Sequence, residues 1–210
     1  LIAGITESAG ANIQWLQEQF FSAEKKEYGD KIFEYMDEVI KKIPPGSNHL
    51  ICTPWMLGER CPVSSTTTRA TLFNISMVHT REHLMRAVYE GIGYNLRWIL
   101  ENYSRDYGFS CDNFRIIGGG ALDDTWMHII ADITGKCFSV VKDPRNAGAV
   151  GAAVVALIGL GELPGFSAAK DFVQVERCYE PDPKNRRVYD HLFENYKRVY
   201  NSLKDTCLLY

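Results

Sequence analysis

A glycine-rich turn is the part of this sequence best suited to chemistry. It follows a short apolar run at residues 114–117 and consists of Gly118, Gly119 and Gly120. Glycine carries no Cβ, so a ligand can lie directly against the backbone, and the turn can adopt positive φ. The segment after the turn has apolar residues at helical spacing, namely Trp126, Ile129, Ile130 and Ile133. The start of such a helix offers free N–H groups and a positive dipole end, which suit a polar or anionic ligand. This pattern fits a ligand-binding turn, and it also fits an ordinary strand-to-helix connection.

Two acidic residues, Asp123 and Asp124, come directly after the turn. Acids are common at helix starts because a negative charge suits the dipole there. If a nucleotide lies on Gly119 and Gly120, the same two carboxylates offer short acceptors to a ribose or a base. No Walker A lysine motif and no G-x-S-x-G elbow occur in the chain, so a nucleotide site here must be of another type.

The residues His79 to His83 fit the H-x-x-E-H pattern of zinc peptidases by letter. That chemistry needs both histidines on one helical face and a further carboxylate ligand. Thr80 is a suitable N-cap for the helix that follows, with Glu82 in its first turn. His79 then lies outside the helix, so we do not expect a metal site.

Composition excludes several classes of protein. The 210 residues are 46% hydrophobic, and the net charge is -3 from 23 basic and 26 acidic residues that are well mixed. Nucleic-acid and membrane surfaces need clustered Lys and Arg, so neither partner is expected. The six cysteines form no C-x-x-C pair, which favours reduced thiols in a cytoplasmic protein. The chain starts at Leu1 with no signal-peptide pattern, and we read it as a piece of a longer protein.

Alternating strands and helices indicate an α/β layered domain with a largely parallel sheet. Strands are expected at residues 49–52, 114–117, 137–141 and 172–175, with a short strand or turn at 71–75. Helices are expected around Ile13, Leu16 and Phe20, and at residues 25–42, 81–103, 125–134, 147–160 and 187–204.

Three of these helices, one loop and one tryptophan have particular features. The helix at 81–103 is expected to bury a stripe made of Leu84, Ala87, Val88, Gly91, Ile92, Asn95 and Ile99. The apolar stretch 147–160 is too short to span a membrane and is expected to be a buried helix packed on the sheet. The aromatic residues of the last helix, at 189, 193, 196 and 200, are interpreted as packing, although they could supply a homodimer interface. The hydroxyl-rich loop 64–68 is interpreted as a solvated surface loop, and Trp55 is left without a role.

Four segments in order resemble the FGGY carbohydrate kinases, nearest to the xylulokinase-like members. Residues 10–16 resemble the family's G-A-S-I-Q-W-L segment, and 58–62 its G-E-R-T-P loop. Residues 70–90 are similar to its second signature. Residues 118–126, with 148–153, resemble its adenosine motif and the following helix. The resemblance covers essentially the whole chain, as the C-terminal half of such an enzyme.

The resemblance implies an actin/hexokinase/Hsp70-like (ribonuclease H-like) fold, with two lobes hinged around an ATP and sugar cleft. It implies that residues 1–210 are the C-terminal nucleotide-binding lobe, and that the N-terminal sugar-binding lobe is absent. Nucleotide contacts are implied for Gly10, Gln14, Gly118, Gly119, Gly120, Ala121 and Asp124. The family's catalytic aspartate belongs to a motif upstream of Leu1, so this fragment alone should not phosphorylate a ketopentose or related polyol with Mg²⁺ and ATP.

Two positions depart from the family's pattern. Asn74 stands where the signature has Gly, so the turn differs locally or uses Asn at positive φ. Asn146 stands where many members have Glu. A non-catalytic nucleotide-binding module of the same fold is the alternative function.

Overall fold

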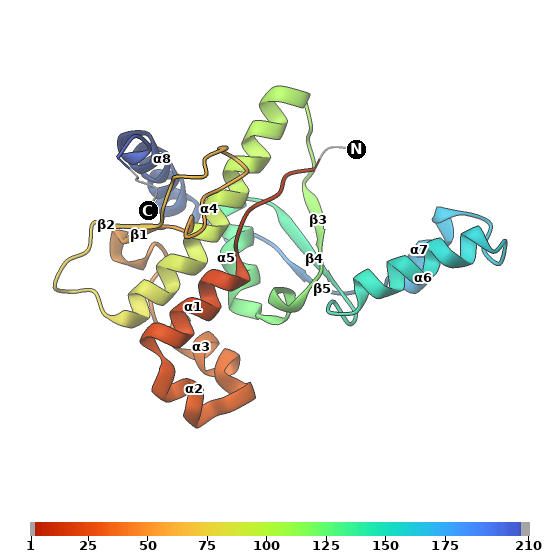
Figure 1. Ribbon diagram of the computed structural model, residues 1–210, viewed down its shortest axis with the longest axis horizontal. Coiled ribbons are helices and arrows are strands. Elements are labelled where there is room, and N and C mark those ends of the chain that lie inside the picture. Colours follow the sequence, from red (N-terminus) through yellow and green to blue (C-terminus); the bar gives the residue numbers. More distant parts are fainter. Residues whose placement is uncertain (1–2, 207–210) are drawn as a thin grey trace.

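The computed structural model describes residues 3–206 (Figure 1). The helices are α1 (Gly10–Phe20), α2 (Ser22–Tyr28), α3 (Ile32–Ile40), α4 (Arg81–Tyr107), α5 (Asp124–Thr134), α6 (Ala147–Gly159), α7 (Ala169–Phe172) and α8 (Arg186–Leu203). The strands are β1 (Ile51–Thr53), β2 (Thr71–Phe73), β3 (Asn113–Ile116), β4 (Cys137–Val141) and β5 (Val175–Tyr179). Short 3₁₀ turns are η1 (Gly29–Lys31), η2 (Ser47–His49), η3 (Gly119–Leu122) and η4 (Phe166–Ala168).

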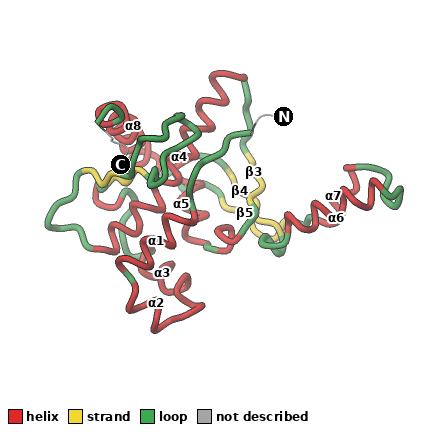
Figure 2. Tube along the Cα trace, in the orientation of Figure 1, coloured by secondary structure: helices red, strands yellow, loops and turns green. Residues whose placement is uncertain are grey.

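The strands form two small sheets on either side of α4 (Figure 2). β3 pairs in parallel with β4, β4 pairs antiparallel with β5, and β1 pairs antiparallel with β2. The expectation of a largely parallel sheet is therefore wrong for the described residues, where one of the three strand pairs is parallel. The strand expected at 172–175 lies further along the chain, because residues up to Phe172 belong to α7.

α4 is the central element of the fold. Thr80 is its N-cap, as expected, and the Thr80 N–H donates to Nδ1 of His83 at 3.2 Å. The helix continues past residue 103 and ends where Gly108 adopts φ 63°. It is buried on nearly all sides rather than along one stripe, so Met85, Tyr89 and Tyr94 are also fully buried. α1, α3, α5 and β1 all pack on it, and α8 contacts it through Tyr189.

A buried ion pair on α4 fixes the chain before β1. Arg86 Nε lies 2.8 Å from Glu90 Oε1, and Tyr189 of α8 donates to the same oxygen. The Gly46 N–H and the Ser47 hydroxyl also donate to Glu90. These bonds hold a left-handed run of four residues, 46–49, all with positive φ. Such backbone is unfavourable for non-glycine residues, so the buried carboxylate stabilises a turn that would not form alone.

The prediction of a single amphipathic helix at 25–42 is wrong. Gly29 has φ 51° and separates α2 from α3. Because the chain turns there, the buried face of this region consists of Phe21, Ile32, Met36 and Ile40, while Phe33 is exposed.

The expectation of a buried helix at 147–160 is also wrong. Figure 1 shows α6 and α7 projecting from the body as an arm, which we call the α6–α7 arm (residues 147–172). Val154 is the one buried residue that α6 contributes among those described. A helix that is apolar on nearly every side is normally enclosed by protein. Residues 3–206 do not supply that cover.

Candidate nucleotide site

The glycine turn joins β3 to α5 through an additional 3₁₀ turn, η3, which the sequence did not predict. Gly118 adopts φ 97° and ψ 174°, a conformation open to glycine and unfavourable for other residues. Its N–H donates to the Pro144 carbonyl at 2.8 Å, which ties the turn to the loop before α6. Within the turn, Ala121 donates to Gly118 and Asp123 donates to Gly120. These bonds fix the backbone that the sequence identified as a ligand surface.

The three glycines have different surroundings. A Cβ on Gly118 or Gly119 would meet no atom within 4 Å, so the backbone there faces open space. A Cβ on Gly120 would stand 2.5 Å from Cζ3 of Trp126. Gly120 is therefore required for packing and Gly118 for its φ angle. Gly119 is the position whose missing side chain leaves room for a ligand.

Asp123 caps α5 and is largely enclosed. Its Oδ1 accepts a hydrogen bond from the Trp126 N–H at 2.8 Å. Burial raises the pKa of Asp123 to about 6, and the charge of Asp37 on α3 adds to the shift. Burial also opposes ionisation of Asp37, but hydrogen bonds from Lys41 and Thr125 outweigh it and lower the pKa of that carboxyl. Two carboxyl groups, one with a raised pKa and one with a lowered pKa, thus lie behind the turn.

Two buried polar atoms in this region, Thr125 Oγ1 and Trp126 Nε1, lack partners within residues 3–206. The buried Tyr89 hydroxyl faces the Asp123 carboxyl. Tyr89 of α4 packs against Trp126 with ring centroids 5.3 Å apart. The sequence did not single out Tyr89 or Asp37, because nothing local to either residue indicates that it approaches the turn.

Asp124 is exposed, and its carboxylate is already engaged. Arg177 and the Tyr179 hydroxyl, both on β5, donate to Asp124 Oδ1. Burial and then the neighbouring Asp124 raise the pKa of Tyr179 to about 12. His128 lies edge-on to Tyr179 at 5.0 Å. The sequence missed Arg177 and Tyr179, because it placed the last strand too early.

Gly10 and Gln14 lie on the exposed face of α1, on a different element from the turn. A Cβ on Gly10 would meet nothing within 4 Å. The Gln14 amide donates to Glu18 at 3.0 Å. Within the described range 3–206, no hydrogen bond joins α1 to the turn. The candidate residues therefore form two separate groups. The first consists of Gly118, Gly119, Gly120, Ala121 and Asp124, and the second of Gly10 and Gln14.

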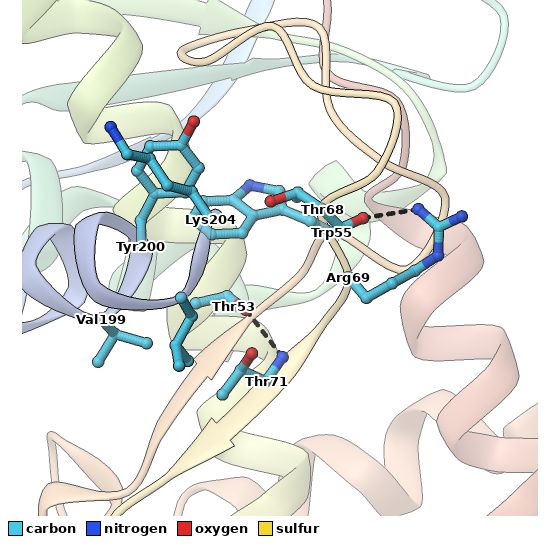
Figure 3. Close-up of a pocket in the computed structure, with 9 residues that line it drawn as sticks. Thr53, Trp55, Thr68, Arg69, Thr71, Val199, Tyr200 and Lys204 are labelled. Carbon is cyan, nitrogen blue, oxygen red and sulfur yellow. Dashed lines mark hydrogen bonds between the residues drawn. The ribbon is translucent and has the colours of Figure 1, made fainter. Parts of the chain in front are cut away.

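Two cavities are lined by other segments of the described chain. One, of about 250 Å³, opens between the end of β4, the start of α6 and α7, beside Lys142, Asp143 and Asp171. The other is about 10 Å³, room for one water molecule, and lies beneath Trp55, Thr68 and Tyr200 (Figure 3). Trp55 is buried and donates to Asn95 at 2.9 Å, so it is a core residue. The sequence predicts that the whole loop at 64–68 is solvated. Thr68 is buried, so this prediction is wrong for that residue.

The histidine pair is fully accounted for by protein contacts. His79 Nδ1 accepts from the Ser76 N–H, and its Nε2 contacts the Asn48 carbonyl. His83 contacts Thr80 through Nδ1 and the Asn48 side chain through Nε2. Among residues 3–206 no group of three His, Cys, Asp or Glu side chains could hold a metal ion.

The remaining sequence features are resolved as follows. The aromatic residues of α8 pack as expected, with Tyr189, Phe193 and Tyr196 fully buried and Tyr200 partly buried. Asn74 adopts φ 69°, the backbone expected of the glycine it replaces. The Asn146 side chain donates to Asp143 at 2.8 Å. No helix within residues 3–206 is both long enough and apolar enough to cross a bilayer.

Comparison with known proteins gives a consistent result. The model of the FGGY family of carbohydrate kinases, C-terminal domain, matches residues 1–160. Xylulose kinase of Bacillus subtilis (strain 168) is 33% identical over 204 residues, which covers 96% of this chain and 39% of that protein. Gluconokinase of the same organism is 25% identical over 205 residues, covering 95% of this chain and 40% of that protein.

A solved structure shows the same fold. The crystal structure of xylulose kinase from Rhodospirillum rubrum matches with a TM-score of 0.82 and 29% identity, over 97% of this chain and 40% of that one. The expected actin/hexokinase-like α/β fold is confirmed. The chain spans about two fifths of the length of the relatives it matches.

Proposed function

The chain belongs to the FGGY family of carbohydrate kinases, and from this we propose that residues 1–210 are the nucleotide-binding C-terminal lobe of an ATP-dependent sugar kinase. The observation that carries the proposal is the unobstructed backbone at Gly118 and Gly119. A flat, uncharged adenosine can lie directly against backbone that carries no side chains, and this is the surface that the family motif predicts. Gly120 and Ala121 complete the turn.

Polar groups beside the turn suit the rest of a nucleoside. Arg177 and Tyr179 hold Asp124 Oδ1, and no residue among 3–206 donates a hydrogen bond to Oδ2. One carboxylate oxygen is therefore fixed and the other can accept from a ribose hydroxyl. Gly10 and Gln14 supply a second, exposed surface at the start of α1, which we assign to the nucleotide on the family motif alone.

The residues present do not by themselves form a Mg²⁺ site, since no suitable acidic cluster occurs within residues 3–206. On the family resemblance alone, we propose that the Mg²⁺ ligands, the phosphate-binding backbone and the catalytic aspartate lie in sequence that precedes Leu1. That aspartate would take the proton of the attacking sugar hydroxyl, and ATP would supply the phosphoryl group. This chain would bind the nucleotide and leave the chemistry to the other lobe.

The α6–α7 arm supports an N-terminal lobe as the protein's own partner. α6 is apolar and nearly uncovered, and β3 has a strand neighbour on one edge only within the described residues. Both are surfaces that preceding sequence could cover. The substrate we propose is a ketopentose or related polyol, one hydroxyl of which accepts the phosphoryl group, since relatives are named for xylulose and gluconate. Five unpaired cysteines among the described residues support a cytoplasmic location.

The test is a titration of the protein with ADP and ATP, in which binding is measured by calorimetry and by thermal shift. Gly119→Val adds a side chain whose Cβ meets no protein atom within 4 Å, so it should abolish nucleotide binding with little change in the melting temperature. Gly159→Val, near the far end of α6 and equally unobstructed, is the matched control and should bind normally. Equal binding by both variants would refute the site.

A measurement of kinase activity distinguishes the proposed function from the alternative, a non-catalytic nucleotide-binding module. A sugar-panel kinase assay on the protein at its natural full length should show phosphoryl transfer to one sugar or polyol. Nucleotide binding without transfer to any member of the panel would favour the module.

A further inference from the structure

Glu59, in the loop that follows β1, is a buried carboxylate that belongs to neither group of candidate nucleotide residues. Its Oε1 accepts from the backbone N–H groups of Glu7 and Arg60, at 2.7 and 2.8 Å. Its Oε2 accepts from the Asn95 amide at 2.9 Å. The backbone of Glu59 exchanges two hydrogen bonds of 2.8 Å with Ser65, which fixes the loop itself. Because burying a carboxylate is costly unless donors satisfy it, Glu59 determines where these donors lie.

One of these donors belongs to the segment that leads into α1. On its way to α1 this segment crosses α4, where a Cβ on Gly4 would meet the Tyr103 side chain (Figure 1). The Glu7 N–H then donates to Glu59, and the Glu7 carboxylate pairs with the Arg60 guanidinium, Nε to Oε2 at 2.5 Å. The loop after β1 therefore holds both the backbone and the side chain of Glu7.

α1 depends on this loop because it has no side-chain cap of its own. Ala9, its N-cap residue, provides no side-chain hydrogen bond, and its first turn contains no acidic residue. Instead, Asn12 in the first turns of the helix donates to the Pro54 carbonyl at 2.6 Å. The Ser8 hydroxyl donates to Asn12 Oδ1 at 2.9 Å. The start of α1 is thus set by residues 54–60 together with the helix itself.

Asn95 of α4 holds Glu59 from the other side. Its Oδ1 accepts from the Trp55 indole at 2.9 Å and from the Tyr196 hydroxyl at 3.2 Å. With its oxygen used in this way, the amide presents its N–H donors to Glu59. All four side chains are buried. The groups of such a network depend on one another, so Glu59 fixes the segment before α1 relative to α4.

α4 is thereby a common reference for both groups of candidate nucleotide residues. Tyr89, six residues before Asn95 on the same helix, packs against Trp126 behind the glycine turn. Six residues of α-helix span about 9 Å. The glycine turn is anchored to α4 through Tyr89, and the start of α1 is anchored to it through Asn95 and Glu59.

We propose that Glu59 is a positioning residue for nucleotide binding, which holds Gly10 and Gln14 at a fixed distance from the glycine turn so that one nucleotide can contact both. This inference rests on the proposed function and adds to it the group that joins the two halves of the site. Gly10 and Gln14 lie on the exposed face of α1, on either side of the buried Asn12 that Pro54 holds. A displaced α1 would therefore carry both away from the turn.

Isothermal titration with ADP on the protein at its natural full length tests this role. Glu59→Gln replaces one carboxylate oxygen by an NH₂ group that faces either the Asn95 amide or two backbone N–H groups, so that a donor opposes a donor. We expect ADP to bind about 5–10-fold more weakly, the range of one lost hydrogen bond. The KM for ATP should rise accordingly, whereas kcat and the KM for the sugar should stay within about 2-fold of wild type.

A matched control separates positioning from stability. Glu90→Gln makes the same change at a buried carboxylate of α4 that bonds to Gly46 and Ser47 and not to the segment before α1. It should lower the melting temperature and leave ADP affinity unchanged. Equal weakening of ADP binding in both variants would assign the effect to lost stability and overturn the proposal.

A second substitution should restore the network. Asn95→Asp in the Glu59→Gln background supplies a carboxylate that accepts from the new amide and still accepts from Trp55 and Tyr196. We expect this double variant to bind ADP within about 2-fold of wild type, because the two sites are coupled. Hydrogen exchange of residues 7–14 should be faster in Glu59→Gln and return to the wild-type rate in the double variant. An affinity that does not recover would overturn the proposal.

A milder pair of variants covers the case in which Glu59→Gln fails to fold. Ser8→Ala removes a buried hydroxyl at the start of α1 and should weaken ADP binding about 2–3-fold. Ser47→Ala removes a buried hydroxyl that bonds to Glu90 and should not. ADP binding that Gly119→Val abolishes, but that Glu59→Gln and Ser8→Ala leave unchanged, would overturn this inference and leave the proposed function standing. No ADP binding by the wild-type protein would overturn both.

Discussion

The indole ring of Trp126 lies beside Gly120, in the space where any other residue would carry its Cβ, with Cζ3 2.5 Å from that position. Trp126 packs in turn on Tyr89 of α4, ring to ring at 5.3 Å. The glycine turn is therefore shaped from behind by the central helix. Its outer surface, at Gly118 and Gly119, is left without obstruction.

Gly120→Ala is expected to destabilise the protein by about 1–3 kcal/mol, because the added methyl group forces the Trp126 ring to move. Gly119→Ala adds the same methyl group in open space and is expected to change stability by less than about 0.5 kcal/mol. Urea denaturation of the two variants measures the difference. Equal stabilities of the two variants would show that the Trp126 ring can move aside without cost.

Asp123 is expected to make stability depend on pH. Its pKa is about 6 in the folded protein and about 3.9 in an unfolded chain. The folded state thus holds the proton more tightly, so the contribution is fully present below about pH 4 and is lost as pH rises through about 6, a change of about 3 kcal/mol. Asp123→Asn does not titrate and still offers an acceptor to Trp126. Unfolding free energies at pH 4 and 7.5 should therefore shift in favour of the variant at the higher pH, and a pH-independent difference would contradict the cause given.

Arg177 is expected to support nucleotide binding through Asp124. Without the guanidinium, the charges of Asp124 and Asp123 would face the nucleotide phosphates with less compensation. Arg177→Met should weaken ADP binding about 2–5-fold at low salt and less at high salt, as for an exposed pair. Arg105→Met removes the arginine of an exposed arginine–aspartate pair at the end of α4 and is the control. Isothermal titration at two salt concentrations distinguishes the variants.

The buried pair on α4 has an internal control on the same helix. Arg86 and Glu90 are four residues apart and buried, while Arg97 and Glu101 have the same spacing with Glu101 exposed. Glu90→Gln leaves a buried guanidinium without its partner and should cost about 3–5 kcal/mol. Glu101→Gln should cost less than about 1 kcal/mol. Similar losses in chemical denaturation would mean that burial does not set the strength of this pair.

Local signals in the sequence were sufficient for several elements. β4 has the predicted bounds, α5 ends before Gly135 as predicted, and Thr80 caps α4. In each case the deciding information lies within a few residues: β-branched and aromatic side chains, a terminal glycine or a capping hydroxyl. The three glycines of the turn were identifiable for the same reason.

Contacts between distant segments were not predictable in this way. Asp37 and Tyr89 reach the turn from α3 and α4, and Arg177 and Tyr179 reach it from β5. Nothing in the neighbouring sequence of these residues indicates where they lie in space. The apolar pattern of residues 147–160 correctly indicates a helix that needs cover, but periodicity does not say which part of a protein provides it.

The α6–α7 arm divides the molecule into two regions with different opening equilibria. α6 packs chiefly against α7 and η4, whereas α4 is enclosed by helices from both ends of the chain. Amide hydrogens of α4 should therefore exchange with solvent only when the whole body unfolds, while those of α6 exchange through local opening. Slower exchange confined to α6 would then reveal when another surface covers the arm, with no need for a structure of the complex.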